Sequence, residues 1–228
     1  MRAISSKPDL VVQVQQALID AIASGELIAG ERLTQEELAL RLGVSRQPVL
    51  QALVLLRDQG LIVDAPNRRG LLVAPLDTRF ITDLYELRTA LDGAAAAAAA
   101  RHASTIDHER GRKLLRQGRD ALAQNNLRLL VQADHAFHQF IYEASGNALL
   151  LDAATRHWHH TRRTMAAHLS QVERLESVWA EHEAILEAVL AGSVRQADKL
   201  SRRHAERSLK LILSQFRSTD EDPPALAA

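Results

Sequence analysis

Two short helical patterns joined by a glycine-containing turn place the strongest restriction on the fold of this sequence. In the stretch LTQEELALRLGVSRQPVLQAL, Thr34 is followed three residues later by Glu37, a pair typical of a helix N-terminus. Gly43 suits a left-handed helix end, Ser45 can cap the helix that follows, and Pro48 falls where a first helical turn tolerates proline. The stretch therefore predicts a helix-turn-helix.

The flanking residues extend this motif into a small domain. Apolar residues that recur every four positions predict an amphipathic helix ending near Gly25: Leu10, Val14, Leu18 and Ile22. After the motif, LIV at 61–63 and LLV at 71–73 flank the turn-forming segment DAPNRRG, which predicts a β-hairpin with a basic tip. We therefore expect residues 1–76 to form a winged helix-turn-helix.

From about residue 77 the strand signals disappear and long helical patterns take over. Six helices are predicted, at 78–103, 105–124, 127–145, 148–169, 171–191 and 193–216. Their expected N-caps are Thr105, Asn126, Asn147 and Ser193. The predicted fold is mainly α, a winged helix-turn-helix of three helices plus a β-hairpin followed by a six-helix antiparallel bundle at 77–217. Residues 218–228 are expected to be a disordered tail.

Composition removes several classes of protein. The 228 residues include no cysteine, which excludes disulfides, thiolate metal sites and cysteine nucleophiles. The absence of cysteine also fits a cytoplasmic location, which we expect. The longest apolar run, GAAAAAAA from Gly93, is too short to span a bilayer, so we expect no membrane insertion. The net charge of zero gives no sign of nucleic-acid binding, but a small module needs only a local basic face.

Polar residues on the apolar faces of three predicted bundle helices indicate a metal site. Asp134 and His138 share one face of the helix at 127–145, whereas His135 points roughly 100° away, at the edge. His182 and His204 lie on the apolar stripes of two later helices. Three imidazoles and one carboxylate suit zinc, nickel, manganese or iron(II). A buried hydrogen-bonded network without metal is the alternative for each of these residues.

Several readings of these residues stay open. The two-histidine motif of zincins and the paired motifs of di-iron bundles are absent, and no inward carboxylate stands out as a general base, so we expect no enzyme. A metal-dependent bundle enzyme and a purely structural metal remain the rivals. Arg88 lies on a buried stripe, either paired with a carboxylate such as Asp92 or free to bind a carboxylate ligand. The basic run at 156–163 is interpreted as a solvated face, with lining of the cavity as the alternative.

These residues resemble those of a known family. The segment LTQEELALRLGVSRQPVLQAL, with the later GLI and RRGLLV, resembles the winged helix-turn-helix of GntR-type bacterial transcription regulators. The segments YELRTALD, DHAFHQFIYEASGN and EHEAILEAV, with the late His204, resemble the FadR-like branch, whose C-terminal ligand-binding domain is called FCD. The resemblance covers about residues 8–215.

The resemblance implies a homodimeric regulator whose effector, often a small organic acid, binds at or next to a divalent metal ion. Metal-binding members use one aspartate and three histidines, and the matching positions here are Asp134, His138, His182 and His204. Arg88 matches an arginine of the first FCD helix that faces this cavity, which makes it the expected effector anchor.

The resemblance also implies that the helix from Ser45 enters the major groove of double-stranded operator DNA. Arg46 is expected to pair with guanine and Gln47 to contact a base or a phosphate. The full set of expected DNA contacts is Ser45, Arg46, Gln47, Arg41, Arg68, Arg69 and Gly70. Leu50 and Gln51 replace the arginine and glutamate that the family usually carries, so the operator sequence does not follow from the resemblance.

Overall fold

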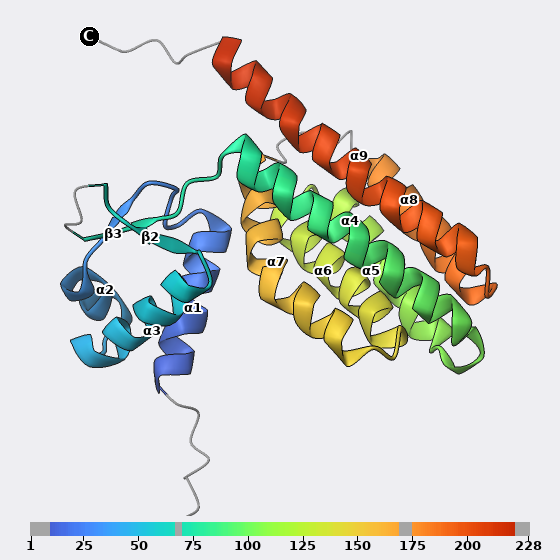
Figure 1. The fold of residues 1–228 in the computed structure, drawn as a ribbon, viewed down its shortest axis with the longest axis horizontal. Helices are drawn as coiled ribbons and strands as arrows, with labels where there is room; N and C mark the ends of the chain where they lie inside the picture. The colour runs from blue at the N-terminus through green and yellow to red at the C-terminus, as the bar shows by residue number, and fades with distance from the viewer. Residues whose placement is uncertain (1–9, 67–69, 169–174, 222–228) are drawn as a thin grey trace, which may run out of the picture. The chain divides into compact units, whose positions relative to one another are not determined.

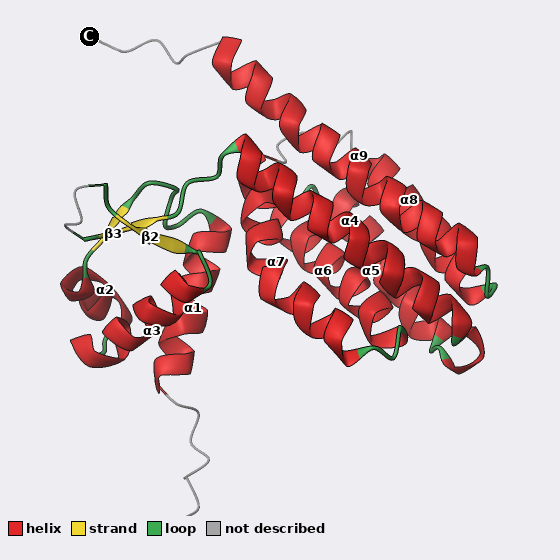
Figure 2. Ribbon diagram, viewed as in Figure 1, coloured by secondary structure: helices red, strands yellow, loops and turns green. Residues whose placement is uncertain are grey.

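The computed structural model describes residues 10–66, 70–168 and 175–221, and the chain divides into two compact units, Met1–Leu76 and Asp77–Ala228 (Figure 1). The described residues are mainly helical, with one small antiparallel sheet in the first unit (Figure 2). The predicted fold class is confirmed. Within the described ranges, no helix combines the length and apolar content that crossing a membrane requires.

The first unit contains the predicted helix-turn-helix. Its elements, in chain order, are α1 (Leu10–Ser24), β1 (Arg32–Leu33), α2 (Gln35–Leu42), α3 (Arg46–Asp58), β2 (Ile62–Asp64) and β3 (Leu71–Val73). Helix α3 buries Val49, Leu53 and Leu56 in a core that α1 and α2 share. Its opposite face is exposed from Arg46 onward, as a helix that reads DNA requires.

The turn between α2 and α3 shows which capping predictions were correct. The side chain of Thr34 accepts a hydrogen bond from the backbone N–H of Glu37 at 3.3 Å, and Gly43 ends α2 in the left-handed conformation with φ 65°. Ser45 occupies the N-cap of α3, but its side chain makes no capping bond, so that part of the prediction was wrong. Pro48 explains the difference, because the third residue of a helix normally donates its N–H to the cap and proline has none.

The wing contains one strand more than the predicted hairpin. β3 lies between β1 and β2, with Leu33 opposite Leu71 and Ile62 opposite Val73. A strand of two residues is too short to show alternation, and β1 was therefore missed. Gly70 precedes β3 with φ 105°, a conformation that favours glycine. The predicted wing-tip contacts at 68 and 69 lie outside the described residues.

The second unit contains the six predicted bundle helices. They are α4 (Thr78–Arg101), α5 (His108–Ala123), α6 (Leu127–Ala144), α7 (Ala148–His168), α8 (Leu175–Leu190) and α9 (Val194–Glu221), with a short 3₁₀ helix, η1 (Ala103–Thr105), after α4. α4 and α9 run side by side (Figure 1). The buried alanines of α4 permit this close packing because they have no bulk beyond Cβ: Ala95, Ala96, Ala99 and Ala100.

Specific predictions were wrong at two helix ends. The hydroxyl of Thr105 donates to the carbonyl of His102 at 2.9 Å, so α5 begins later, where the side chain of Asp107 accepts from the N–H of Arg110. Helix α9 includes residues 218–221, for which the predicted disorder was therefore wrong. The first proline after them is Pro223, so residues 218–221 neither include a proline nor directly precede one. Residues 222–228 lie outside the described part of the chain.

Close packing of α5 against α8 fixes the helix that carries His182. A Cβ added to Gly118 of α5 would lie 2.0 Å from the ring of Trp179, which shows how closely the ring approaches this backbone. Trp179 in turn contacts His182 edge-on, with ring centroids 4.8 Å apart. This edge-on contact packs the His182 ring against the bundle core and favours the orientation seen in the structure.

Candidate metal centre

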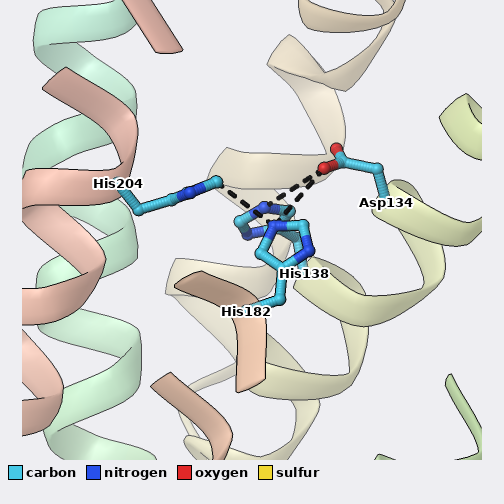
Figure 3. Close-up of side chains that lie close together, drawn as sticks. All are labelled: Asp134, His138, His182 and His204. Carbon is cyan, nitrogen blue, oxygen red and sulfur yellow. Dashed lines mark hydrogen bonds and ion pairs between the residues drawn. The ribbon is translucent and has the colours of Figure 1, made fainter. Parts of the chain in front are cut away.

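Four polar side chains from three helices meet inside the bundle. Asp134 and His138 come from α6, His182 from α8 and His204 from α9. One potential ligand atom from each lies within 4.8 Å of the others, and all four residues are buried. Figure 3 shows the side chains pointing toward one another. The convergence expected from the sequence pattern is therefore present.

The distances place three imidazole nitrogens around one carboxylate. His182 Nε2 lies 3.3 Å from His204 Nε2 and 3.5 Å from Asp134 Oδ1. His138 Nε2 lies 3.8 Å from the same aspartate oxygen. Small side-chain movements would allow these atoms to bind one ion at the distances of about 2.0–2.2 Å that are typical of zinc ligands.

A carboxylate outside the predicted set orients His204. Its Nδ1 lies 2.9 Å from Glu181 Oε2, and Glu181 also pairs with Arg207. A carboxylate can only accept, so Nδ1 donates to it, and in the neutral tautomer Nε2 is then the nitrogen with a free lone pair facing the cluster. Histidine ligands of metals commonly have such a partner. The sequence analysis missed Glu181, whose position next to His182 on α8 was the only signal.

We expect Glu181→Gln to weaken zinc binding about tenfold, because an amide holds the His204 ring less strongly than a carboxylate does. Titration against a chromophoric zinc chelator measures the effect. Glu187→Gln is the matched control. Glu187 is also on α8, but it is exposed and its ion pair with Arg112 is long, at 3.8 Å. Equal affinities for the two variants would contradict an orienting role for Glu181.

Burial keeps two of the histidines neutral. Desolvation, with a smaller contribution from the charge of Arg88, holds the pKa of His138 well below its ordinary value. Desolvation and the proximity of His204 do the same to the pKa of His182. Neutral imidazole is the form that binds metal, so protons compete weakly for these nitrogens at neutral pH. Burial also raises the pKa of Asp134, which Arg88 partly opposes.

Two buried atoms of the cluster have no hydrogen-bond partner among the described residues. They are Asp134 Oδ2 and His182 Nδ1. A buried carboxylate oxygen without a donor is costly, whereas a divalent cation would satisfy the carboxylate directly. The donor set of one oxygen and three nitrogens also suits a first-row divalent metal. The residues present therefore fit a metal ion.

Arg88 of α4 lies next to the cluster, where its guanidinium contacts the side chains of Asp92 and His138. Its Nε donates to Asp92 Oδ2 at 3.1 Å, and its NH2 group lies 2.7 Å from His138 Nε2. The hydroxyl of Tyr142 donates to Asp92 Oδ1 at 2.6 Å, which fixes the carboxylate. The ion pair with Asp92 is the first of the two alternatives that the sequence left open. Burial lowers the pKa of Arg88, but the charge of Asp92 raises it, and the net direction is upward.

The histidine- and arginine-rich run of α7 is only partly a solvated face. Arg156 is exposed and pairs with Asp152, as a solvated face predicts. Further along the helix, His160 and Arg163 are buried, so the interpretation was wrong for them. His135 lies at the edge of the cluster, as predicted, and stacks on Trp158 with ring centroids 4.4 Å apart.

The described DNA-contact candidates lie on the exposed side of the helix-turn-helix. Arg46 and Gln47 are exposed in the first turn of α3, and Arg46 pairs with Glu36 of α2. Arg41 pairs with Glu26 at 2.7 Å, so a phosphate contact requires this exposed ion pair to open. Exposed pairs are worth little, so neither pairing prevents DNA binding.

Two family models match the chain. Residues 10–73 match the gntR family of bacterial regulatory proteins, and residues 83–207 match the FCD domain. The chain therefore belongs to the GntR family of bacterial regulatory proteins, and its second unit is an FCD domain. It is a transcription regulator of that family.

Named relatives agree with this assignment. A protein of Streptomyces ambofaciens, an uncharacterized HTH-type transcriptional regulator in an unstable DNA locus, is 29% identical over 88% of this chain and 82% of its own length. An Escherichia coli K12 protein with the provisional name L-lactate dehydrogenase operon regulatory protein is 28% identical over 94% of this chain and 88% of its own. Both are described as regulators.

Two solved structures share the fold. Escherichia coli McbR/YncC superposes with a TM-score of 0.81 at 20% identity, covering 92% of this chain and 100% of that one. A GntR regulator from Rhodococcus sp. RHA1 gives a TM-score of 0.78 at 23% identity, covering 91% of this chain and 99% of that one. Because the identities are low, these similarities establish the fold and no more.

Proposed function

We propose that this regulator is a cytoplasmic homodimer whose binding to a pseudo-palindromic operator is changed by a small monocarboxylate. The acid binds in the FCD domain, next to a divalent metal held by Asp134, His138, His182 and His204. The observation that carries the proposal is the buried meeting of these four side chains, in which one carboxylate oxygen has no hydrogen-bond donor among the residues that the structure describes.

The metal would supply a positive charge with open coordination positions for an anionic ligand. The protein's own residues would then hold the rest of the acid. Two openings that border the cluster share Arg88 in their lining; one also contacts His138 and the other Asp134. Apolar side chains such as Leu84, Leu91 and Met165 make up much of the remaining walls. A compact acid with a short apolar body fits such walls.

The buried charges favour an effector with one negative charge. Beside the cluster, Arg88 carries one positive charge, and Asp92 and Asp134 carry one negative charge each when ionised. A divalent ion changes this balance to one uncompensated positive charge, while Glu181 is already paired with Arg207. Uncompensated charge is costly in a buried site, and one carboxylate removes the cost. A second or third carboxylate would create the opposite imbalance.

The first unit would supply the DNA-binding surface. Two copies of α3 in a dimer would enter successive major grooves, with Arg46 and Gln47 at the bases. The wing, which includes Gly70, would follow the minor groove, and Arg68 and Arg69 are proposed as further contacts there. The acid can alter operator affinity only by favouring one arrangement of the domains over another.

A metal assay coupled to a stability screen tests the proposal. Purified protein should contain one divalent ion per chain by elemental analysis. A monocarboxylate at about a hundred times its Kd should then raise Tm by about 5 °C, and a chelator should abolish this shift. L-lactate is the first acid to test because of the operon in the name of the Escherichia coli relative. Succinate and citrate test the charge argument.

The same screen distinguishes the proposed effector-binding metal from a purely structural one. If a chelator melts the bundle and no acid changes Tm with metal present, the metal is structural and the effector part of the proposal is wrong. If the protein binds no divalent ion at all, the four residues form a polar network and the whole metal-based proposal fails.

A further inference from the structure

Arg88 forms a hydrogen bond with the same nitrogen through which His138 would bind the metal. Its NH2 group lies 2.7 Å from His138 Nε2, inside the protein. A guanidinium group has only donors, so the nitrogen must accept and its lone pair is already in use. The other ring nitrogen, Nδ1, lies 3.8 Å from Asp92 Oδ2 and carries the proton on that side.

The metal needs the same lone pair. His138 Nε2 is the nitrogen near Asp134, and it lies 3.8 Å from Oδ1. One lone pair cannot bind a metal and accept a guanidinium hydrogen bond together. A divalent cation at this nitrogen would also face the positive charge of Arg88 at close range, and in a buried site that repulsion is only weakly screened.

We propose that Arg88 competes with the metal for His138, substituting for the ion when the site is empty and leaving His138 when the ion enters. The inference rests on the proposed metal site. The inference adds to that site a residue, Arg88, that weakens metal binding. If Arg88 instead helped to hold the ion, it would strengthen metal binding.

The surroundings of Arg88 allow this movement without loss of its position. The bond from Nε to Asp92 is separate from the NH2 contact, and Tyr142 holds Asp92 from the other side. The guanidinium can therefore pivot about Asp92 while its NH2 edge leaves His138. The ring of Trp158, 5.9 Å from the guanidinium carbon, offers an aromatic face in the adjoining opening.

The movement would couple the metal to the acid. Once displaced, the guanidinium presents a free edge, and a carboxylate binds such an edge bidentately. A bound carboxylate then keeps Arg88 away from His138 and offsets its repulsion of the ion. Metal and monocarboxylate would each raise the affinity of the other, as linkage requires. A purely structural ion would show no such coupling.

Zinc affinity of a charge-matched double variant tests the competition. Arg88→Met with Asp92→Asn removes the ion pair as a neutral unit, so the net charge near the site is unchanged. We expect the full-length variant to bind Zn²⁺ alone about tenfold more tightly than the unaltered protein, because one charge-assisted hydrogen bond no longer has to break. The control is Arg156→Met with Asp152→Asn, an exposed pair of the same type and spacing on α7.

The control pair should leave zinc affinity unchanged. A folded Arg88→Met/Asp92→Asn variant that binds zinc equally or more weakly would overturn the inference while leaving the metal site intact. If neither this variant nor the unaltered protein binds zinc, the proposed function fails and the inference with it.

A measurement on the unaltered protein decides the matter if the double variant does not fold. In the metal-free protein, the buried Arg88 NH2 protons should be protected from exchange and visible by side-chain nitrogen NMR. Zinc should shift His138 Nε2 and remove that protection. Arg88 signals that do not change when zinc binds would overturn the inference.

Discussion

Replacing His182 and His204 together by alanine is expected to leave the purified protein without bound divalent metal. The two residues supply two of the three imidazoles, and Asp134 and His138 on one helix cannot by themselves complete a tetrahedral set. Elemental analysis should fall from one ion per chain to a background value. Stabilisation by any monocarboxylate should disappear in the same variant, because the acid would have lost its principal partner.

The control for this variant separates metal binding from packing. His182 is fully buried and stacks on Phe137 at 4.4 Å, so alanine also creates a cavity. Glutamine at both positions keeps most of the volume, and circular dichroism shows whether the helices persist. Alanine at His102 and His108, which are exposed, removes two imidazoles without touching the cluster. A folded His182/His204 variant that retains a full equivalent of metal would contradict the assignment of these residues as metal ligands.

Arg46→Ala is expected to weaken binding to the operator by about tenfold to a hundredfold and binding to random duplex DNA much less. A bidentate contact from arginine to guanine is worth about 1–3 kcal/mol of discrimination, whereas the loss of one phosphate contact weakens all sequences alike. The operator is first selected from a random duplex pool with the unaltered protein. Fluorescence anisotropy at one fixed salt concentration then gives both affinities.

Arg57→Ala is the matched control on the same helix. Arg57 is also exposed, but it lies in the last turn of α3 and pairs with Asp64 at 3.4 Å. Since the first turn of a recognition helix meets the bases, Arg57→Ala should reduce both affinities slightly and equally. Equal losses on both DNAs for Arg46→Ala would make Arg46 a backbone contact and leave base reading to Gln47 and its neighbours.

Local signals predicted most of the fold, because they depend on residues close in sequence. Thr34 and Gly43 cap the two ends of α2 as expected, and the side chain of Asn126 caps α6 by accepting from Leu129 N–H. Errors arose where several local choices compete. Thr105 and Asp107 are both good caps, and only the hydrogen bond from Thr105 to the preceding turn decides between them.

Periodicity could select the inward side chains but not their partners. The four cluster residues were found because each interrupts an apolar stripe, and stripes on packed helices must face one interior. The bonds from Tyr142 to Asp92 and from His204 to Glu181 were missed, since they join separate helices. The sequence also left both roles of Arg88 open. The packing of α4 against α6 decides which groups its guanidinium contacts.

The order of the cluster residues along the chain affects when the centre can form during translation. Domains generally fold as units, N-terminal first, as the chain leaves the ribosome. The helix-turn-helix is complete long before α9, so a nascent chain can present a finished DNA reader while its last imidazole has yet to be synthesised. Every newly made chain would thus complete its DNA-binding unit before the residue that completes the Asp134, His138, His182 and His204 cluster is synthesised.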